Sequence, residues 1–286
     1  MLAMIAILTV ASFLPAAADD AYQEAPMLAL RVAAGELPPV VQRLPDRPVV
    51  VEPVESIGIY GGTWRRLARS TGDMGLNSRL GYETLVRWDR TGTRVVPGIA
   101  ESWEVSEDAT KFTFHLRRGM RWSDGHLFTS QDFLFTQNDI ELNLDLQASY
   151  SPWKVLNSKV MELETPDDYT VVIRFSEPYG LFLEMLCYRG QMAGLCMPKH
   201  YLSKFHASYR DPDELNEQAR DAGFLDWKGY FRDLSNREEN PDLPTINAFV
   251  CKVSFPEPRA LAVRNPYYWK VDPEGNQLPY IDQIAY

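Results

Sequence analysis

Apolar and polar residues alternate from residue 100 to residue 117, and this period of two predicts a pair of half-buried strands. A polar turn at 107–110 separates the two runs. The apolar positions are Trp103 and Val105 in the first run and Phe112, Phe114 and Leu116 in the second. We therefore expect a hairpin with one apolar face and one solvated face, and we expect the rest of the chain to be organised around it.

The residues after this hairpin predict a tight turn and then a helix. Met120 and Trp122 resume the apolar pattern, and Ser-Asp-Gly at 123–125 is typical of a turn. A helix is expected over 130–144, opened by Thr129 or Ser130, with Asp132 supporting the first turn as in a capping box.

Similar patterns predict the remaining elements. Strands are expected over 57–70, 82–89, 94–97, 155–163, 169–175, 248–254, 260–265 and 280–286, and helices over 178–189, 198–205, 211–222 and 225–234. Thr-Pro-Asp-Asp at 165–168 predicts a type I turn. Residues 19–56 form a Pro-rich lead-in, expected to run extended along a surface rather than to form a domain. The fold class is therefore mixed α/β.

Composition narrows the class of protein. The chain has 286 residues, is 45% hydrophobic and contains 7 Trp, 14 Tyr and 13 Phe, which excludes a disordered chain. The formal net charge of −10 disfavours nucleic acids and anionic membranes as partners.

Residues 1–18 have the pattern of a secretory signal peptide. Residues 2–14 are almost all apolar, Pro15 interrupts the run, and three alanines at 16–18 offer a cleavage site before Asp19. The run is too short to span a bilayer, which needs about 20 apolar residues. One feature departs from the pattern, because the first basic residue is Arg31. The alternative is a buried apolar helix.

The cysteines and histidines allow few chemistries. Cys187 and Cys196 are close enough in sequence to form a disulfide in an oxidising compartment, and three free thiols, with Cys251, are the alternative. His200 and His206 could lie near each other, but no HExxH or CxxC motif is present, so no metal site is expected. No cofactor is expected either, since the chain has no phosphate-binding P-loop.

A carbohydrate hydrolase is the rival from another functional class. Such an enzyme needs two carboxylates that converge on the glycosidic bond. The candidates are Glu83, Glu101, Glu104, Glu177 and Glu184, and their spacing in the sequence does not show whether any two of them converge. Asp167 and Asp168 are expected to be turn residues rather than an acid–base pair.

Several segments resemble the family 5 extracellular solute-binding proteins of bacterial ABC importers. The signature region reads AESWEVSED at 100–108, FTFHLRRGMRWSDG at 112–125 and FTSQDFLF at 128–135. Further similar segments are YGGT at 60–63, GYETLV at 81–86, MPKHYL at 197–202, NPYYW at 265–269 and PYID at 279–282. The last two segments resemble those of family branches that include sugar receptors. This resemblance slightly favours an oligosaccharide as the expected ligand.

This resemblance implies a receptor rather than an enzyme. It would be a periplasmic, monomeric protein that holds a peptide or an oligosaccharide between two lobes and hands it to a membrane permease when the hinge closes. A cell-surface lipid anchor is the alternative location, although no lipobox cysteine is present. By the resemblance, residues 57–279 form the first lobe, with a β-rich subdomain at about 82–175, and 280–286 begin the crossover to a second lobe that is mostly missing.

Aromatic and polar residues at the edges of loops are the expected ligand contacts, because solute sites combine stacking faces with a few polar groups. Tyr82 follows a glycine, and Tyr188 and Arg189 end an apolar helix. Asn77 and Arg79 lie in a loop near glycines. Trp103 and Trp122 are expected to be core residues instead.

Overall fold

The computed structural model describes residues 21–76, 80–147, 150–188, 195–255 and 257–286. The α-helices are α1 Pro26–Ala33, α2 Val40–Arg43, α3 Thr71–Met74, α4 Ser130–Phe135, α5 Phe182–Leu186, α7 Lys199–Leu202, α8 Pro212–Asp221 and α9 Trp227–Leu234. A π-helix, η1, spans Thr136–Glu141, and two 3₁₀ turns, η2 and η3, span Pro152–Lys154 and Ser203–Phe205.

Fourteen strands are described. They are β1 Val49–Val50, β2 Thr63–Arg65, β3 Val86–Trp88, β4 Val95–Pro97, β5 Ala100–Val105, β6 Lys111–Leu116, β7 Val155–Leu156, β8 Lys159–Val160, β9 Glu162–Asp167, β10 Thr170–Arg174, β11 Phe249–Val253, β12 Leu261–Arg264, β13 Lys270–Val271 and β14 Gln283–Ala285.

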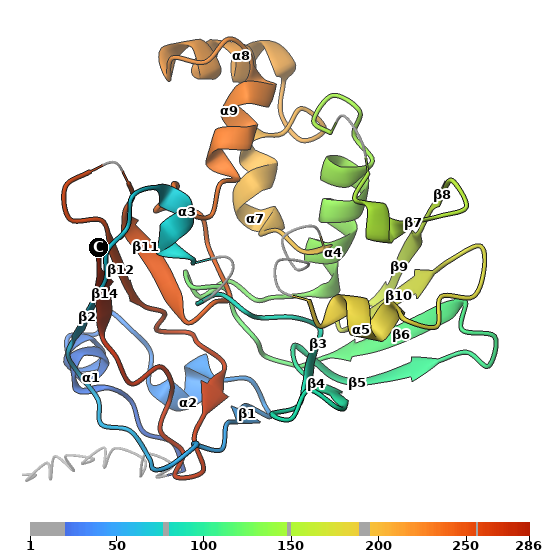
Figure 1. Cartoon of the computed structure of the whole chain (residues 1–286). Coiled ribbons are helices and arrows are strands. Elements are labelled where there is room, and N and C mark those ends of the chain that lie inside the picture. The colour runs from blue at the N-terminus through green and yellow to red at the C-terminus, as the bar shows by residue number, and fades with distance from the viewer. Residues whose placement is uncertain (1–20, 77–79, 148–149, 189–194, 256) are drawn as a thin grey trace, which may run out of the picture.

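Two four-stranded sheets organise the molecule, with a group of helices beside them (Figure 1). The first sheet has the order β5-β6-β10-β9 and is antiparallel. The second has the order β11-β12-β14-β2 and is mixed, because β2 pairs parallel with β14. One hydrophobic cluster contains buried residues from both sheets, including Phe112, Ile173, Ala262 and Ile284. The predicted mixed α/β fold is confirmed.

The predicted hairpin is present as β5 and β6, with Trp103 opposite Phe114. Phe112, Phe114 and Leu116 are buried, as the alternation predicts. The expectation for the first strand is wrong at Val105, which is 42% exposed. β5 is the edge strand of its sheet, so its far end has a neighbour on one side only.

The predicted helix start is confirmed. Thr129 caps α4, and Thr129 and Asp132 form a capping box. The buried Asp132 carboxylate also accepts hydrogen bonds from Trp122 Nε1 at 3.1 Å and from the Lys199 backbone N–H at 3.0 Å. The cap therefore also joins the 122–126 turn to α7, and η1 continues the helix to Glu141.

The predictions for 155–175 are partly wrong. The single strand expected over 155–163 is a tight β7–β8 hairpin followed by β9, because Asn157 and Ser158 both have positive φ and turn the chain between β7 and β8. The expected turn at 165–168 lies two residues later, at 167–170, with 168 and 169 between β9 and β10. Pro166 is accommodated within β9, because β9 is an edge strand.

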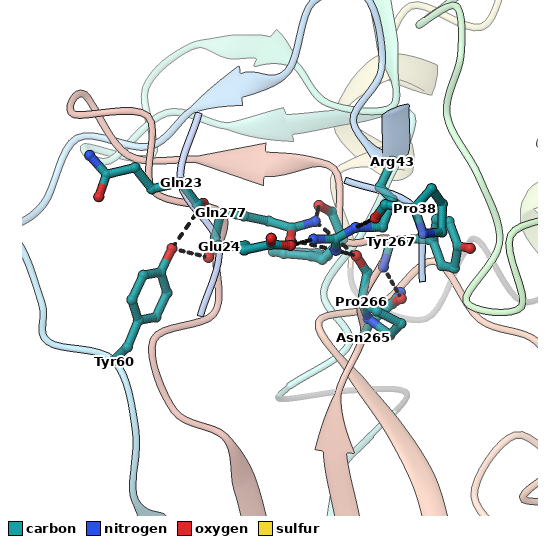
Figure 2. A network of polar contacts seen from close by, with 10 residues as sticks. Gln23, Glu24, Pro38, Arg43, Tyr60, Asn265, Pro266, Tyr267 and Gln277 are labelled. Atoms are coloured by element: carbon teal, nitrogen blue, oxygen red, sulfur yellow. Dashed lines mark hydrogen bonds and ion pairs between the residues drawn. The ribbon is translucent and has the colours of Figure 1, made fainter. Parts of the chain in front are cut away.

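The Pro-rich lead-in is more ordered than expected, with two short helices and β1, which pairs parallel with β13. The fully buried Arg43 of α2 ties it to the loop at 265–277 (Figure 2). Its guanidinium forms an ion pair with Glu24 and donates to Gln277 Oε1 at 2.9 Å and to the Pro266 carbonyl. The lead-in is therefore an integral part of the folded structure.

Three further expectations are corrected. The strand over 57–70 is only β2, and Leu67 is 97% exposed. The helix over 178–189 is only α5, so Leu181 precedes it and is 68% exposed. Cys187, Cys196 and Cys251 are all buried free thiols, so of the two alternatives left open the Cys187–Cys196 disulfide is wrong and three free thiols are confirmed.

His206 lies in the core of the helical group formed by α7, α8 and α9 and packs edge-on against Trp227 and Phe231. Its Nε2 lies 2.8 Å from the Asp139 carbonyl, and its Nδ1 accepts the Ser208 backbone N–H. Burial lowers the pKa of His206, and the Asp139 carbonyl only partly opposes this.

This lowered pKa predicts a pH-dependent stability. Because the neutral form is favoured in the folded state, the contribution of His206 is fully present above its unfolded-state pKa of about 6.5 and is lost as the pH falls through the folded-state pKa. The melting temperature should therefore fall between pH 7.5 and pH 5. A His206→Gln variant should be less stable at pH 7.5 by about 1–3 kcal/mol and should lose less on acidification. An equal loss in both proteins would contradict this assignment.

Candidate ligand-binding ledge

Two of the predicted site residues lie on one ledge, which we define as Tyr82, Glu184, Cys187 and Tyr188. The Tyr82 hydroxyl donates a hydrogen bond to the Cys187 carbonyl, although the two residues are 105 positions apart. Tyr188 follows directly and is 60% exposed. α5, which leads into this turn, contacts β3, which follows Tyr82. Asn77, Arg79 and Arg189 lie outside the described residues, so their places at the site stay predictions.

The loop that leads to Tyr82 is held from beneath by two asparagines. Asn247 donates from Nδ2 to the Leu76 carbonyl at 3.1 Å, and Asn265 donates from Nδ2 to the Asn247 carbonyl at 2.9 Å. Gly81 lies against the same carbonyl, since a Cβ at this position would be 1.8 Å from Leu76 O. In this backbone conformation, position 81 therefore accommodates only glycine.

A buried ion pair fixes the backbone after Tyr82. Glu83 is 6% exposed and forms an ion pair with Lys270 Nζ at 2.7 Å. The Tyr268 hydroxyl donates to the other oxygen of the same carboxylate. Burial lowers the pKa of Lys270 and raises that of Tyr268, while the Glu83 charge favours the protonated form of each. The NPYYWK segment is thereby joined to the base of the ledge.

The ledge also contains an acidic side chain, Glu184, which was not predicted as a ligand contact. Oε2 of Glu184 is buried and accepts no hydrogen bond within the described part of the chain. Glu184 and Arg87 both act on the Cys187 thiol, whose pKa is raised to about 11, chiefly by burial. No pattern in the sequence marked Glu184 as a neighbour of Tyr188, because α5 ends at Leu186 and Tyr188 lies beyond it. The ledge thus offers an aromatic face and a carboxylate acceptor.

The glutamates considered for hydrolysis lie in separate environments. Glu83 is neutralised by Lys270, Glu101 lies 2.7 Å from Arg47, and Glu104 lies 3.6 Å from His115. Glu177 is exposed, and Glu184 belongs to the ledge. The described environments therefore give no support to a hydrolase that uses two converging carboxylates.

The histidines are also dispersed. His200 stacks on His126 with ring centroids 4.0 Å apart and lies 2.7 Å from Asp124, whereas His206 lies in the helical core. Within the described ranges, no group of three or more His, Cys, Asp or Glu residues could hold a metal ion. None of the helices described there has the length and apolarity needed to cross a membrane.

The family model of the bacterial extracellular solute-binding proteins, family 5 Middle, matches residues 94–286. The chain belongs to this family. The match contains the hairpin, the capped helix and the NPYYWK segment, and so confirms the resemblance inferred from those motifs.

Two curated relatives of this family 5 protein are named for different ligands. The chain is 31% identical to the periplasmic alpha-galactoside-binding protein of Rhizobium meliloti (strain 1021) over 284 residues, 89% of this chain and 37% of the relative. It is 31% identical to the periplasmic oligopeptide-binding protein OppA of Escherichia coli (strain K12) over 218 residues, 72% of this chain and 33% of the relative. The chain thus spans about a third of the length of each relative.

Solved structures of the family show the same fold. An oligopeptide-binding protein OppA superposes with a TM-score of 0.86 at 42% identity and covers 92% of this chain and 41% of its own. The periplasmic binding protein MelB from Agrobacterium fabrum C58, in complex with stachyose, gives a TM-score of 0.70 at 27% identity. This superposition covers 96% of this chain and 41% of MelB. These partial coverages fit a single lobe of a periplasmic binding protein.

Proposed function

We propose that this family 5 chain contributes one wall of the substrate-binding component of an ABC importer. The component captures a peptide or an oligosaccharide in the periplasm, after export directed by residues 1–18, and delivers it to a membrane permease. Closure of a hinge buries the ligand, and the protein acts as a monomer without changing the ligand chemically. The observation that carries this proposal is the superposition on OppA over 92% of the chain.

The ledge supplies the contacts that such a wall needs. Tyr188 presents an exposed ring for stacking, and Tyr82 is held in place by its bond to the Cys187 carbonyl. The carboxylate of Glu184 can accept a hydrogen bond from a sugar hydroxyl or from a peptide ammonium. Asn77, Arg79 and Arg189 are proposed as further contacts on the same loops. The ledge therefore suits both ligand classes named for the relatives.

Calorimetric titration with stachyose and with trialanine tests this proposal. We expect saturable binding of one of the two, with the ligand recovered unchanged, and at least tenfold weaker binding by a Tyr188→Ala variant. Tyr169→Ala is the matched control, because Tyr169 stacks under Arg118 at the β9–β10 turn. Cleavage of stachyose, or equal affinities of the two variants, would overturn the proposal.

A further inference from the structure

A cavity of about 370 Å³ lies on the side of the molecule where α1 packs, and we call it the α1 cavity. Its walls come from α1 and the residues after it, the turn at 123–124, the loop at 241–244 and residues 266–267. Its apolar lining includes Val250 and Val263, which are paired across β11 and β12. Cys251, the next residue of β11, belongs to the main core, so the cavity and that core lie on opposite faces of the sheet. None of the ledge residues lines it.

The walls of the α1 cavity are fixed by partly buried hydrogen bonds. Arg43 donates from Nε to the Pro38 carbonyl at 2.9 Å and from Nη1 to the Pro266 carbonyl, which joins the segment after α1 to residues 266–267 (Figure 2). Two hydrogen bonds join the turn at 123–124 to the end of the loop at 241–244. Ser123 N donates to Thr245 O at 2.9 Å, and Thr245 N donates to Ser123 Oγ at 3.0 Å. The cavity is therefore formed before any ligand arrives, which lowers the entropic cost of binding.

The rim carries charges of both signs, and some of them already have partners. Arg31 lies 3.6 Å from Glu36, and Asp124 lies 2.7 Å from His200. Lys252 and Asp242 are exposed, line the cavity and form no ion pair within the described residues.

Arg264, the last residue of β12, also borders the cavity. The residue is 3% exposed, and one terminal nitrogen donates to Asp282 Oδ1 at 2.9 Å. Its Nε–H is buried and finds no acceptor in the described part of the chain. Arg264 lies opposite Phe249 across β11 and β12, so strand alternation puts its side chain on the core face of the sheet and not beside Val263. Its guanidinium lies over the Tyr60 ring, so it is not expected to contact a ligand in the cavity.

We propose that the α1 cavity is a second solute site, separate from the ledge, that binds a small zwitterion such as a free α-amino acid or a dipeptide. The ligand carboxylate pairs with Lys252, the ammonium group pairs with Asp242 and Asp124, and an apolar side chain packs on Val250 and Val263. A neutral sugar would form an ion pair with neither Lys252 nor Asp242, and a simple anion would pair with Lys252 alone. The volume lies within the range of about 300–1,000 Å³ that is typical of small-molecule sites.

Calorimetry with L-leucine and with dileucine tests this site, with N-acetyl-leucine amide as a probe that keeps the side chain and lacks both charges. We expect saturable binding of at least one zwitterion and at least tenfold weaker binding of the amide. Lys252→Gln and Asp242→Asn should each weaken the zwitterion at least tenfold. Lys159→Gln and Asp213→Asn, at exposed positions outside the cavity, should leave it unchanged.

The outcome is independent of the ledge. A Tyr188→Ala variant should bind the zwitterion as the unsubstituted protein does, whereas Lys252→Gln should leave the affinity for stachyose or trialanine unchanged. Absence of saturable binding by both zwitterions would overturn the second site. So would equal affinity for the amide, or loss of zwitterion binding in Tyr188→Ala but not in Lys252→Gln.

Discussion

Replacing Lys270 by methionine is expected to lower the free energy of unfolding by about 3–5 kcal/mol, because it leaves Glu83 as an uncompensated buried charge. Lys270 and Glu83 are 4% and 6% exposed, and their charged atoms lie 2.7 Å apart. The Tyr268 hydroxyl would remain as a donor to Glu83, but a neutral donor does not cancel the charge. Urea unfolding followed by fluorescence measures the loss.

Two further variants separate the charge from the packing. The double variant Glu83→Gln with Lys270→Met should recover more than half of the loss, because a buried pair replaced as a whole costs far less than a pair that is broken. Arg174→Met breaks a solvent-exposed pair with Glu164 at 3.1 Å and should cost less than about 1 kcal/mol. If the double variant is as unstable as Lys270→Met, the buried charge is not the cause.

The fold could be predicted from the sequence where short-range patterns decide it. The alternation around Phe112 and Phe114 predicted β6, and the Thr129–Asp132 pair predicted the start of α4. The local hydrophobic pattern gave wrong predictions where contacts with distant parts of the chain determine the local structure. Leu67 is an apolar residue within the predicted strand over 57–70, yet β2 ends at Arg65 and Leu67 is exposed. Cys187 and Cys196 are close in sequence, but sequence separation does not show whether two thiols meet.

The candidate site was predictable only in part, because it joins segments that are distant along the chain. Tyr82 and Tyr188 could be chosen one by one as loop-edge aromatics, but no local pattern indicated that Tyr82 bonds to the residue before Tyr188. The role of Asn247 depends on a carbonyl 171 positions away. No local pattern distinguished Lys270, and only the structure shows that it neutralises Glu83. Such pairings come from the topology of the chain and not from local periodicity.

A Gly81→Ala variant is expected to lose ligand affinity at the ledge by at least tenfold, which is about 1.4 kcal/mol. The new Cβ would lie 1.8 Å from the Leu76 carbonyl oxygen and 2.4 Å from Asn247 Nδ2, so the backbone that leads to Tyr82 must shift. Backbone atoms cannot rotate away as the end of a flexible side chain can, so the shift passes to the ledge.

Gly72→Ala is the matched control, because its Cβ would meet nothing within 4 Å and Gly72 lies in the short helix α3. Calorimetry with whichever of stachyose or trialanine binds the unsubstituted protein measures both variants. The Gly72 variant should bind as that protein does. If Gly81→Ala binds as tightly as Gly72→Ala, the shape of this loop does not control the ledge. If both bind weakly, the effect comes from flexibility lost when any glycine in the segment is replaced, and the close approach of Gly81 to Leu76 is not its cause.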